Sequence, residues 1–508
     1  MSPEAIRSRI HVMGSLVSPL LGAALLASVA LDANAAGNEG GGPDNRPNVI
    51  VIVADDMGSG DFGAAGGKLP TPNIDRLANS GARMTSGYVT AAVCAPSRAA
   101  LLAGRPQTRF GYEFNPVGRD ETNGLSLGET TIAQTMKAAG YRTGMVGKWH
   151  VGQARGYQPL DRGFDSFFGV MGGATPYLRT IGPDDLHVVT AEDSLITRQR
   201  LPIFDGRDPV DTGEYVTDLF TDRAIRFVGN EQSKQPFFLY FAYTAPHTPL
   251  QASAKYMARV KPGGSDFERV YAGMMFALDD GVGRLLDHLE KTGQRDNTLI
   301  IFLSDNGCPG YIGGACSNGI LNGFKGYPWE GGLRVPYLVS WPARIKPAVR
   351  NDLVSSLDVA ATIAAVAGTA HPKAEGTDLI PVLSGKKRLR DRGLFWRMGP
   401  NSVVRQGRWK LIIVNKSAGA ASDSDALGRS RRADGLPAAV SPLGQWIFLY
   451  DLQADPGEKN DVSARHPEVV ARLRREWTAW DRANVPPQWT SRRSVNAEVN
   501  GVRVELFN

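Results

Sequence analysis

Cysteine and histidine are both scarce in this chain, which has three cysteines and seven histidines among 508 residues. The sequence also lacks a long block of lysine and arginine and any aromatic-basic RNA motif, so nucleic-acid binding is not favoured. Beyond the N-terminal 30 residues no segment is apolar enough to cross a bilayer, and no internal repeat is apparent. These absences point to a globular chain without an integral membrane segment after its N-terminus.

The overall charge is mildly positive. The formal net charge is +6 and the pI is about 9.1, and the basic residues are spread along the sequence. A basic surface suits an anionic small molecule or a polysaccharide at least as well as nucleic acid. We therefore expect an anionic ligand without specifying its class from charge alone.

The first 35 residues have the features of a secretory signal peptide. Arg7 and Arg9 precede an apolar run over residues 12–30, and Ala33-Asn34-Ala35 supplies small residues for cleavage. An uncleaved anchor is the alternative, but the run is barely long enough to span and contains glycine, serine and proline. We expect export to the periplasm or secretion, with residues 36–46 as a glycine-rich linker.

Export bears on the three cysteines, because an exported chain meets an oxidising compartment. Cys308 and Cys316 flank a short glycine-rich loop and could pair. Their pairing would leave Cys94 unpaired, and a single leftover cysteine in a secreted protein needs an explanation.

From residue 47 to residue 386, apolar runs alternate with helical patterns. Length alone suggests about two to four units, although large α/β proteins often form one continuous core. The alternation predicts an α/β fold whose mixed, mostly parallel central sheet lies between helices. The clearest strands are predicted at 48–53, 143–146, 237–243 and 299–303, and helices at 73–80, 97–103, 130–139 and 267–292.

The pattern changes near Lys387, where short strands separated by turns replace the alternation. Strands predicted at 394–397, 402–404, 409–414 and 446–450, with a helix at 467–482, indicate a small α+β subdomain. We place this subdomain at residues 387–508, with an antiparallel sheet and a terminal helix. Residues 416–440 are rich in alanine, serine, aspartate, glycine and arginine and are predicted to be a mobile insertion.

Polar residues follow four of the predicted parallel strands, at the edge where ligands bind in open sheets. They are Asp55-Asp56, Lys148-Trp149-His150, His247 and Asp305-Asn306. The oxygen donors Asp55, Asp56, Asp305 and Asn306 suit Ca²⁺ or Mg²⁺ rather than zinc, which would favour more histidine. An aspartate after a strand is more often a turn or cap residue, but two such pairs are harder to dismiss.

Cys94 opens a predicted helix. Pro96 and Ser97 favour a helix start, and an alanine- and leucine-rich run continues it. The N-terminus of a helix attracts anions, and Arg98 would lie one turn further along. On helix reasoning alone, a buried structural cysteine is the favoured interpretation.

Several short motifs nevertheless occur in one order that resembles the type I, formylglycine-dependent sulfatases of the alkaline phosphatase superfamily. Within that family the chain resembles the arylsulfatases and N-acetylgalactosamine-6-sulfatases. The matching motifs are Val53-Ala54-Asp55-Asp56, Cys94-Ala95-Pro96-Ser97-Arg98 with Gly104-Arg105, Gly147-Lys148-Trp149-His150, Ala245-Pro246-His247-Thr248-Pro249, Ser304-Asp305-Asn306-Gly307, Gly323-Phe324-Lys325-Gly326 with Glu330-Gly331-Gly332-Leu333-Arg334-Val335-Pro336, Leu449-Tyr450-Asp451-Leu452 and Asp455-Pro456-Gly457-Glu458-Lys459-Asn460. The resemblance covers about residues 46–482 and implies that residues 47–386 are the sulfatase catalytic domain.

The resemblance also implies a modified nucleophile and a metal. A formylglycine-generating or sulfatase-maturating enzyme would oxidise Cys94 to formylglycine. The hydrate of that aldehyde would attack sulfur, form a covalent sulfo-enzyme intermediate and then release sulfate. One Ca²⁺, with Mg²⁺ as the less favoured ion, would be bound by Asp55, Asp56, residue 94, Asp305 and Asn306.

Five further residues receive roles from the same resemblance. Lys148 and Lys325 would neutralise the sulfuryl group, and Arg98 would orient the nucleophile. His247 would protonate the leaving oxygen, and His150 would accept the proton of the second hydroxyl.

The substrate is predicted less closely than the reaction. We favour a sulfated carbohydrate, either a glycosaminoglycan or a marine galactan fragment, with 6-O-sulfated galactose or N-acetylgalactosamine as the narrow prediction. Arginine, tyrosine and asparagine suit sugar hydroxyls and acidic groups, which gives the candidate contacts Arg109, Tyr112, Asn115, Arg119, Tyr177, Arg179 and His187.

Three other functions compete with this interpretation. A small aryl sulfate is an alternative substrate, and hydrolysis of phosphonate or phosphate esters is an alternative reaction within the superfamily. A non-catalytic glycan-binding protein is less favoured, because Cys94 and all five residues given these roles are present.

Overall fold

The computed structural model describes residues 46–116, 123–188, 201–229, 235–417, 429–431, 443–491 and 493–507. The predicted signal peptide, nearly all of the linker and Arg119 lie outside these residues, as does most of the predicted insertion at 416–440. Asp44–Asn508 forms one compact unit, and the domain boundary at residue 386 stays a prediction. Among the described residues, no helix combines the length and apolarity needed to cross a membrane.

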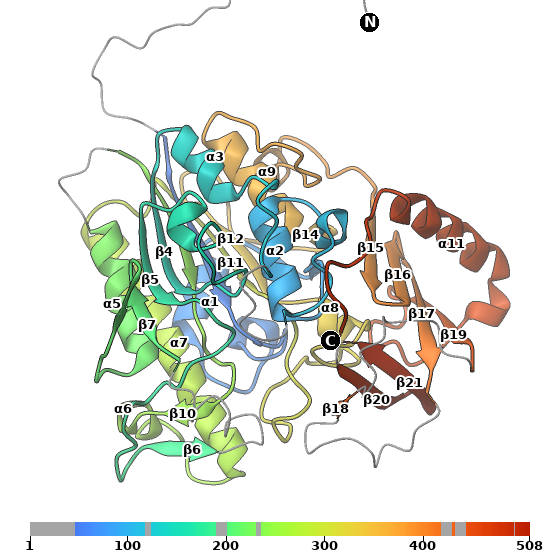
Figure 1. Ribbon diagram of the computed structural model, residues 1–508, viewed down its shortest axis with the longest axis horizontal. Helices are drawn as coiled ribbons and strands as arrows, with labels where there is room; N and C mark the ends of the chain where they lie inside the picture. Colours follow the sequence, from blue (N-terminus) through green and yellow to red (C-terminus); the bar gives the residue numbers. More distant parts are fainter. Residues whose placement is uncertain are drawn as a thin grey trace, which may run out of the picture. The chain divides into compact units, whose positions relative to one another are not determined.

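A ten-stranded mixed sheet forms the centre of this unit (Figure 1). Five neighbouring strands run parallel: β11 (Thr298–Ser304), β1 (Asn48–Ala54), β9 (Phe237–Ala242), β4 (Arg142–Lys148) and β5 (Ser166–Val170). At one edge β12 (Tyr337–Ser340), β2 (Ala82–Met84) and β13 (Ala348–Arg350) continue the sheet, and at the other β7 (Ile203–Asp205) and β8 (Asp208–Val210) do so. Because β12, β7 and β8 pair antiparallel, the predicted mixed, mostly parallel sheet is confirmed.

Both faces of the sheet are covered by helices, as the unbroken apolar sequence of its central strands predicts. In β1 the side chains of Ile50 and Ile52 pack in one core, and those of Val49, Val51 and Val53 pack in the other. The first core includes α1 (Pro72–Asn79), α5 (Val216–Val228) and α7 (Asp266–Lys291), and the second includes α2 (Cys94–Ala103), α3 (Ile132–Ala138) and α9 (Leu357–Val366). Figure 1 shows these two sets of helices around the sheet.

Shorter elements complete this part of the chain. Two small ladders pair β10 (Leu250–Ala252) with β6 (Leu186–Val188) and β14 (Val354–Ser355) with β3 (Gly87–Tyr88). Three single-turn helices follow other segments, namely α6 (Ala254–Met257), α8 (Glu330–Leu333) and α10 (Ile380–Leu383). Of these, α8 follows the loop that contains Lys325.

A seven-stranded sheet follows the central fold. Its order is β15 (Gly393–Met398), β16 (Asn401–Gln406), β17 (Trp409–Lys416), β21 (Val502–Phe507), β20 (Arg493–Val499) and β18 (Arg429–Arg431), and β19 (Gln445–Asp451) pairs with β17. All of its pairings are antiparallel, as predicted. The helix α11 (Pro467–Asp481) packs against β15, β16 and β17.

The predicted terminal helix is not the last element of the chain. After α11 the chain returns as the hairpin of β20 and β21, which adds to β17. The turn residues Asn500 and Gly501 have φ of 50° and 77°, as a tight hairpin requires. An Asn-Gly pair between two alternating segments is the sequence signal for this hairpin, and the prediction of a terminal helix overlooked it.

Candidate active site

The register of the parallel strands places the polar residues that follow them side by side at one edge of the sheet. Ala54 pairs with Ser304, Val53 pairs with Ala242, and Ala242 pairs with Gly147. The residues that follow these positions, Asp55, Asp305 and Lys148 among them, therefore meet at the carboxyl edge of the parallel strands. The first four predicted strands thus contribute to a single site.

Asp55 and Asp305 are buried and are bridged by the guanidinium group of Arg98. Lys148 Nζ lies 2.7 Å from Asp55 Oδ2. Arg98 Nε donates to Asp305 Oδ2 at 2.8 Å, and its NH2 lies 3.6 Å from Asp55 Oδ1. Arg98 NH1 also donates to the Lys148 carbonyl at 3.1 Å, so these four side chains form one buried network.

Asp56 forms the second half of the site and has a left-handed backbone, with φ of 70°. Lys325 Nζ lies 2.7 Å from Asp56 Oδ1 and 2.8 Å from Oδ2. Asn306 Nδ2 donates to Asp56 Oδ1 at 2.7 Å, and the Asp56 amide donates to Asp305 Oδ1 at 3.2 Å. His150 also has a positive φ, 62°, and such non-glycine conformations concentrate at functional sites.

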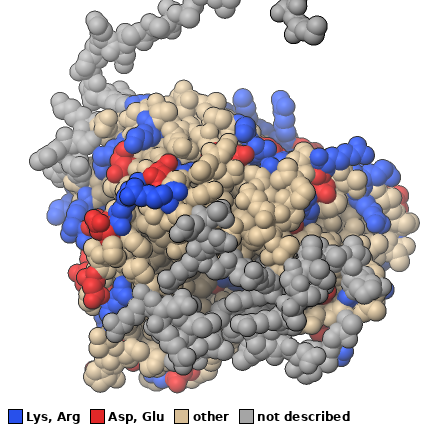
Figure 2. Space-filling model, viewed as in Figure 1, with Lys and Arg blue, Asp and Glu red and all other residues tan. Residues whose placement is uncertain are grey.

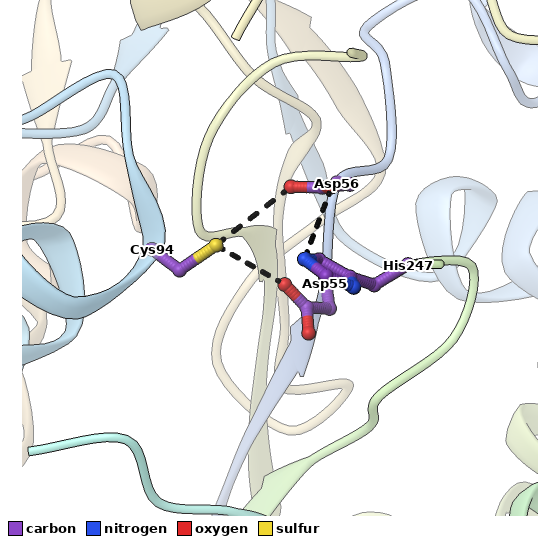
Figure 3. Close-up of side chains that lie close together, drawn as sticks. All are labelled: Asp55, Asp56, Cys94 and His247. Carbon is purple, nitrogen blue, oxygen red and sulfur yellow. Dashed lines mark hydrogen bonds and ion pairs between the residues drawn. The ribbon is translucent and has the colours of Figure 1, made fainter. Parts of the chain in front are cut away.

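Cys94 points into this cluster from the first residue of α2 (Figure 3). Its Sγ lies 3.5 Å from Asp55 Oδ1 and 3.8 Å from Asp56 Oδ1. The side chain is the unmodified thiol, so Sγ marks where a heteroatom at position 94 meets both carboxylates. Burial raises the pKa of the Cys94 thiol, which makes an activated thiolate a poor account of this residue.

The two predicted histidines have different neighbours. His247 Nε2 is 3.6 Å from Asp56 Oδ2, and 12% of the side chain is exposed. His150 packs beside Gly173, where a Cβ would come within 2.7 Å of its Nε2. The His150 Nδ1 is buried without a hydrogen-bond partner among the described residues. Burial, followed by Lys148 and Arg98, holds the pKa of His150 well below its usual value, so its imidazole is neutral at pH 7.

Burial and neighbouring charges act in opposite directions on the carboxylates. Burial raises the pKa of Asp55, and the attraction of Lys148 does not overcome that effect. Burial also opposes ionisation of Asp56 and Asp305, yet Lys325 holds the pKa of Asp56 below its ordinary value and Arg98 with Lys148 does so for Asp305. Three carboxylates in one buried site repel one another, and a cation among them relieves that repulsion.

The donors in the site fit a hard divalent cation. The candidate ligand atoms of Asp55, Asp56, Cys94 and His247 all lie within 4.8 Å of one another. Asn306 Oδ1 is buried and accepts no hydrogen bond from the described residues, although buried acceptors are normally satisfied. An unsatisfied amide oxygen beside buried carboxylates is the donor set that Ca²⁺ prefers.

The candidate substrate contacts are placed differently from one another. Arg109 is paired with Glu375 at 2.9 and 3.0 Å and also donates to Asn484 Oδ1 and the Trp480 carbonyl. Its donors are therefore engaged by the protein. Arg179 lies 3.8 Å from Asp211, and His187 is exposed on β6.

Three other candidates form hydrogen bonds to the backbone at or beside the predicted site residues. Tyr112 is buried and its hydroxyl donates to the His150 carbonyl at 3.3 Å. Tyr177 is buried and donates to the carbonyls of Thr244 and His247, the latter at 3.0 Å. Asn115 Oδ1 accepts from the Ala95 amide at 3.1 Å, next to Cys94. These contacts position the site residues.

Sequence reasoning did not predict the buried ion pairs that attach α8 to the C-terminal sheet. Glu330 Oε1 lies 2.9 Å from Lys410 Nζ on β17, and that ammonium lies 2.9 Å from Glu458 Oε1. All three side chains are fully buried. Glu458 Oε2 also accepts from the Glu330 amide at 2.7 Å, and Tyr88 donates to Glu330 Oε2 at 2.7 Å. Glu330 and Glu458 stand in recognised motifs, but Lys410 gives no signal in the sequence.

The disulfide loop adjoins both Asn306 and Lys325. Cys308 is bonded to Cys316, and Cys94 is the free cysteine. The Lys325 amide donates to the Cys308 carbonyl at 2.9 Å. Gly307, between Asn306 and Cys308, approaches α8 so closely that a Cβ would lie 1.7 Å from the Gly331 carbonyl oxygen. Only glycine fits there.

Comparison with known proteins agrees with this geometry. Residues 47–369 match the family model described as Sulfatase. The chain is 34% identical to human arylsulfatase A over 462 residues, covering 84% of this chain and 86% of that protein. It is 36% identical to an arylsulfatase of Hemicentrotus pulcherrimus over 476 residues, covering 85% and 80%.

A solved structure shows the same relationship in three dimensions. The crystal structure of Ps i-CgsB in complex with k-i-k-neocarrahexaose is 32% identical, with a TM-score of 0.73, and the match covers 88% of this chain and 95% of that one.

The fold and the buried site define a hydrolase of the alkaline phosphatase superfamily. Within it, this chain belongs to the sulfatase family. The predicted resemblance is therefore confirmed, and the chain is placed among the sulfuric ester hydrolases.

Proposed function

We propose that this chain is an exported, Ca²⁺-dependent sulfatase that uses formylglycine derived from Cys94 to hydrolyse sulfated carbohydrates. The observation that carries the proposal is the position of Cys94 Sγ, within 3.8 Å of both Asp55 and Asp56. Arg98, Lys148 and Lys325 surround the same carboxylates. A site with this many cations is suited to a sulfate group.

The metal would be held by Asp55, Asp56, Asp305, Asn306 and residue 94. When bound, Ca²⁺ supplies a fixed positive charge for oxygens of the nucleophile and the sulfate, and formylglycine supplies the nucleophile through its hydrate. Lys148 pairs with Asp55 and Lys325 pairs with Asp56, so each lysine would contribute positive charge to the sulfate oxygens. Arg98 fixes the start of α2 relative to Asp305.

The histidines then divide the proton transfers. The partly exposed His247 lies beside Asp56, where it can protonate the leaving alcohol. His150 is neutral and its Nδ1 has no hydrogen-bond partner among the described residues, so it would accept a proton from the hydroxyl at position 94.

Maturation must precede folding. Cys94 is 2% exposed in the folded chain, so a modifying enzyme cannot reach its side chain there. We propose that a formylglycine-generating or sulfatase-maturating enzyme acts on the extended chain, before or during export.

A carbohydrate substrate is favoured over the alternatives. The related Ps i-CgsB was crystallised in complex with k-i-k-neocarrahexaose, which supports a sulfated galactan or a glycosaminoglycan fragment here. Relatives named arylsulfatases make a small aryl sulfate the second candidate. The phosphonate monoester hydrolase of Agrobacterium radiobacter shares the fold at only 20% identity, so hydrolysis of phosphonate or phosphate esters is less favoured, as is a non-catalytic role.

The test is sulfate release by the matured enzyme from a panel of defined esters. The panel contains 6-O-sulfated galactose and N-acetylgalactosamine, sulfated disaccharides, nitrophenyl sulfate and a nitrophenyl phosphonate. We expect the highest kcat/KM on a sulfated sugar and trace activity from Cys94→Ser on every ester. Wild-type turnover by Cys94→Ser would sink the formylglycine proposal, and a preference for the phosphonate would sink the sulfatase proposal.

A further inference from the structure

One short segment of the chain carries four exposed cations close together. Lys386, Lys387, Arg388 and Arg390 lie between α10 and β15 and are all exposed. None of these four cations forms an ion pair within the described part of the chain. Four unpaired cations within five residues create a strong local positive potential.

This segment is firmly held at both ends. The amides of Lys386 and Lys387 donate to the Pro381 carbonyl at 2.9 Å, and Leu389 packs against the core. Arg392 donates to Asp358 Oδ1 at 2.8 Å and to the Leu353 carbonyl at 3.0 Å. The cations are therefore presented by a fixed backbone, which lowers the entropy cost of binding.

Two arginines of α11 extend the same surface. Gly393, at the start of β15, pairs with Gln406, and Gln406 accepts a hydrogen bond from Arg472. Arg475 lies one turn further along α11. Figure 2 shows Lys and Arg gathered along the upper right of this face, over the segment leading to β15 and over α11.

We call Lys386, Lys387, Arg388, Arg390, Arg472 and Arg475 the basic strip. Only Asp391 and Glu476 carry negative charge within its two segments, 386–391 and 472–476, and Glu476 is paired with Arg472 at 3.0 Å. The strip contributes no residue to the catalytic site.

The arrangement indicates the kind of ligand. A small anion is bound in an enclosure of converging donors, whereas the strip presents cations in a row on an exposed surface. A row of this kind matches a polymer with repeated negative charges, which gains affinity by displacing counterions from several sites at once.

We propose that the basic strip binds a linear sulfated polysaccharide and holds it while sulfate esters on that polymer reach the active site. The identity of the polymer rests on the proposed sulfatase function. The presence of the cationic surface does not depend on that function. Tethering raises the local concentration of esters at the catalytic residues. The enzyme then acts on polymers with a lower KM than on monosaccharides.

The test uses the full-length matured enzyme and a variant with Lys386→Ser, Lys387→Ser, Arg388→Ser and Arg390→Ser. The matched control replaces four exposed lysines elsewhere, Lys68, Lys261, Lys291 and Lys346, by serine, so both variants lose the same charge. Binding to dextran sulfate is measured at several salt concentrations, with uncharged dextran as the blank. Duplex DNA and phosphatidylglycerol vesicles are tested in parallel.

We expect the strip variant to bind dextran sulfate at least about tenfold more weakly at low salt, with a shallower dependence of log Kd on log salt. The control variant should stay within about threefold of wild type, because scattered charges do not act together. Turnover of a small sulfate ester should be unchanged in both variants.

Equal losses in the two variants would overturn the proposal, as would wild-type affinity in the strip variant. The wild-type protein could also bind DNA or vesicles as tightly as dextran sulfate and lose that binding in the strip variant. That result would assign the surface to another class of partner and would also overturn the proposal. Polymer binding is measured without turnover, so the two proposals fail separately. Failure of the enzyme to hydrolyse any sulfate ester would contradict the proposed function, whereas the binding data alone would still test the basic strip.

Discussion

Each carboxylate of the site has its own cation. Asp55 is paired with Lys148, Asp56 with Lys325, and Asp305 with Arg98. The pairs of Asp55 and Asp305 are fully buried and Lys325 is 12% exposed, and an unpaired charge in a buried environment costs several kcal/mol. The charges are therefore interdependent, and the informative substitutions are those that leave the pairs intact.

Tyr177→Phe is one such substitution. The Tyr177 hydroxyl holds the loop that carries His247, so its loss should lower kcat about tenfold through misplacement of the imidazole, with KM little changed. The control Tyr215→Phe removes a hydroxyl that donates to the Gln251 carbonyl. Both should lose about 1 kcal/mol of stability. A main effect on KM in Tyr177→Phe would assign that residue to substrate binding.

Asn306→Ala tests the metal. Loss of the unsatisfied Oδ1 should weaken Ca²⁺ binding by at least about tenfold, measured by calorimetric titration of metal-free protein. Asn318→Ala is the control, since Asn318 supports the disulfide loop through the Cys308 amide. Unchanged Ca²⁺ affinity in Asn306→Ala would remove this residue from the ligand set.

Among the elements, α8 joins the catalytic fold to the C-terminal sheet. The Gly331 amide donates to the Asn322 carbonyl in the Lys325 loop, and the Gly332 carbonyl accepts from the amide of Gly307, which follows Asn306. On its other side, Glu330 contacts Lys410 of β17. The C-terminal sheet therefore helps to set the position of two active-site loops.

Lys410→Met tests this connection. Removal of the ammonium leaves Glu330 and Glu458 buried together, and we expect a loss of about 3–5 kcal/mol in the free energy of unfolding. Lys416→Met, on the same strand, removes a partly exposed ammonium over the Trp446 ring and should cost less than about 1 kcal/mol. Equal small losses in the two variants would contradict a structural role for the triad.

The same triad predicts a pH dependence. Burial raises the pKa of Glu458 to about 7, above the ordinary value near 4.5. Between these values the unfolded chain has released this proton and the folded chain retains it, so stability falls as pH rises through this window. The slope is at most about 1.4 kcal/mol per pH unit.

Glu458→Gln removes the titrating group, so the variant should show a flatter profile in denaturant unfolding between pH 5 and 7. The pKa of Glu330 is lowered by Lys410 despite its burial, and its contribution is lost only at lower pH. A constant difference between wild type and variant across the window would contradict the raised pKa.

At the scale of the whole molecule, the sequence predicted the parts that depend on local pattern. The strands β1, β4, β9 and β11 were identifiable because continuous apolar runs ended in polar residues. The pairing of Lys410 with Glu330 could not be predicted, since it joins positions 80 residues apart and nothing local marks the lysine as buried.

The predicted substrate contacts also show that local sequence does not determine which neighbours a side chain meets. Arg109 and Tyr177 have side chains that suit sugars, but their donors face Glu375 and the His247 loop. Residue type indicates what a side chain can bind, whereas its direction depends on long-range packing.

The central claim is that Cys94 becomes the nucleophile as formylglycine. The most direct measurement is peptide mass analysis of residue 94 in purified enzyme, combined with the sulfate-release rate of the same preparation. We predict that the formylglycine fraction and the specific activity rise together across preparations made with and without a maturating enzyme. Full activity in a preparation whose residue 94 is entirely unmodified cysteine would contradict the account.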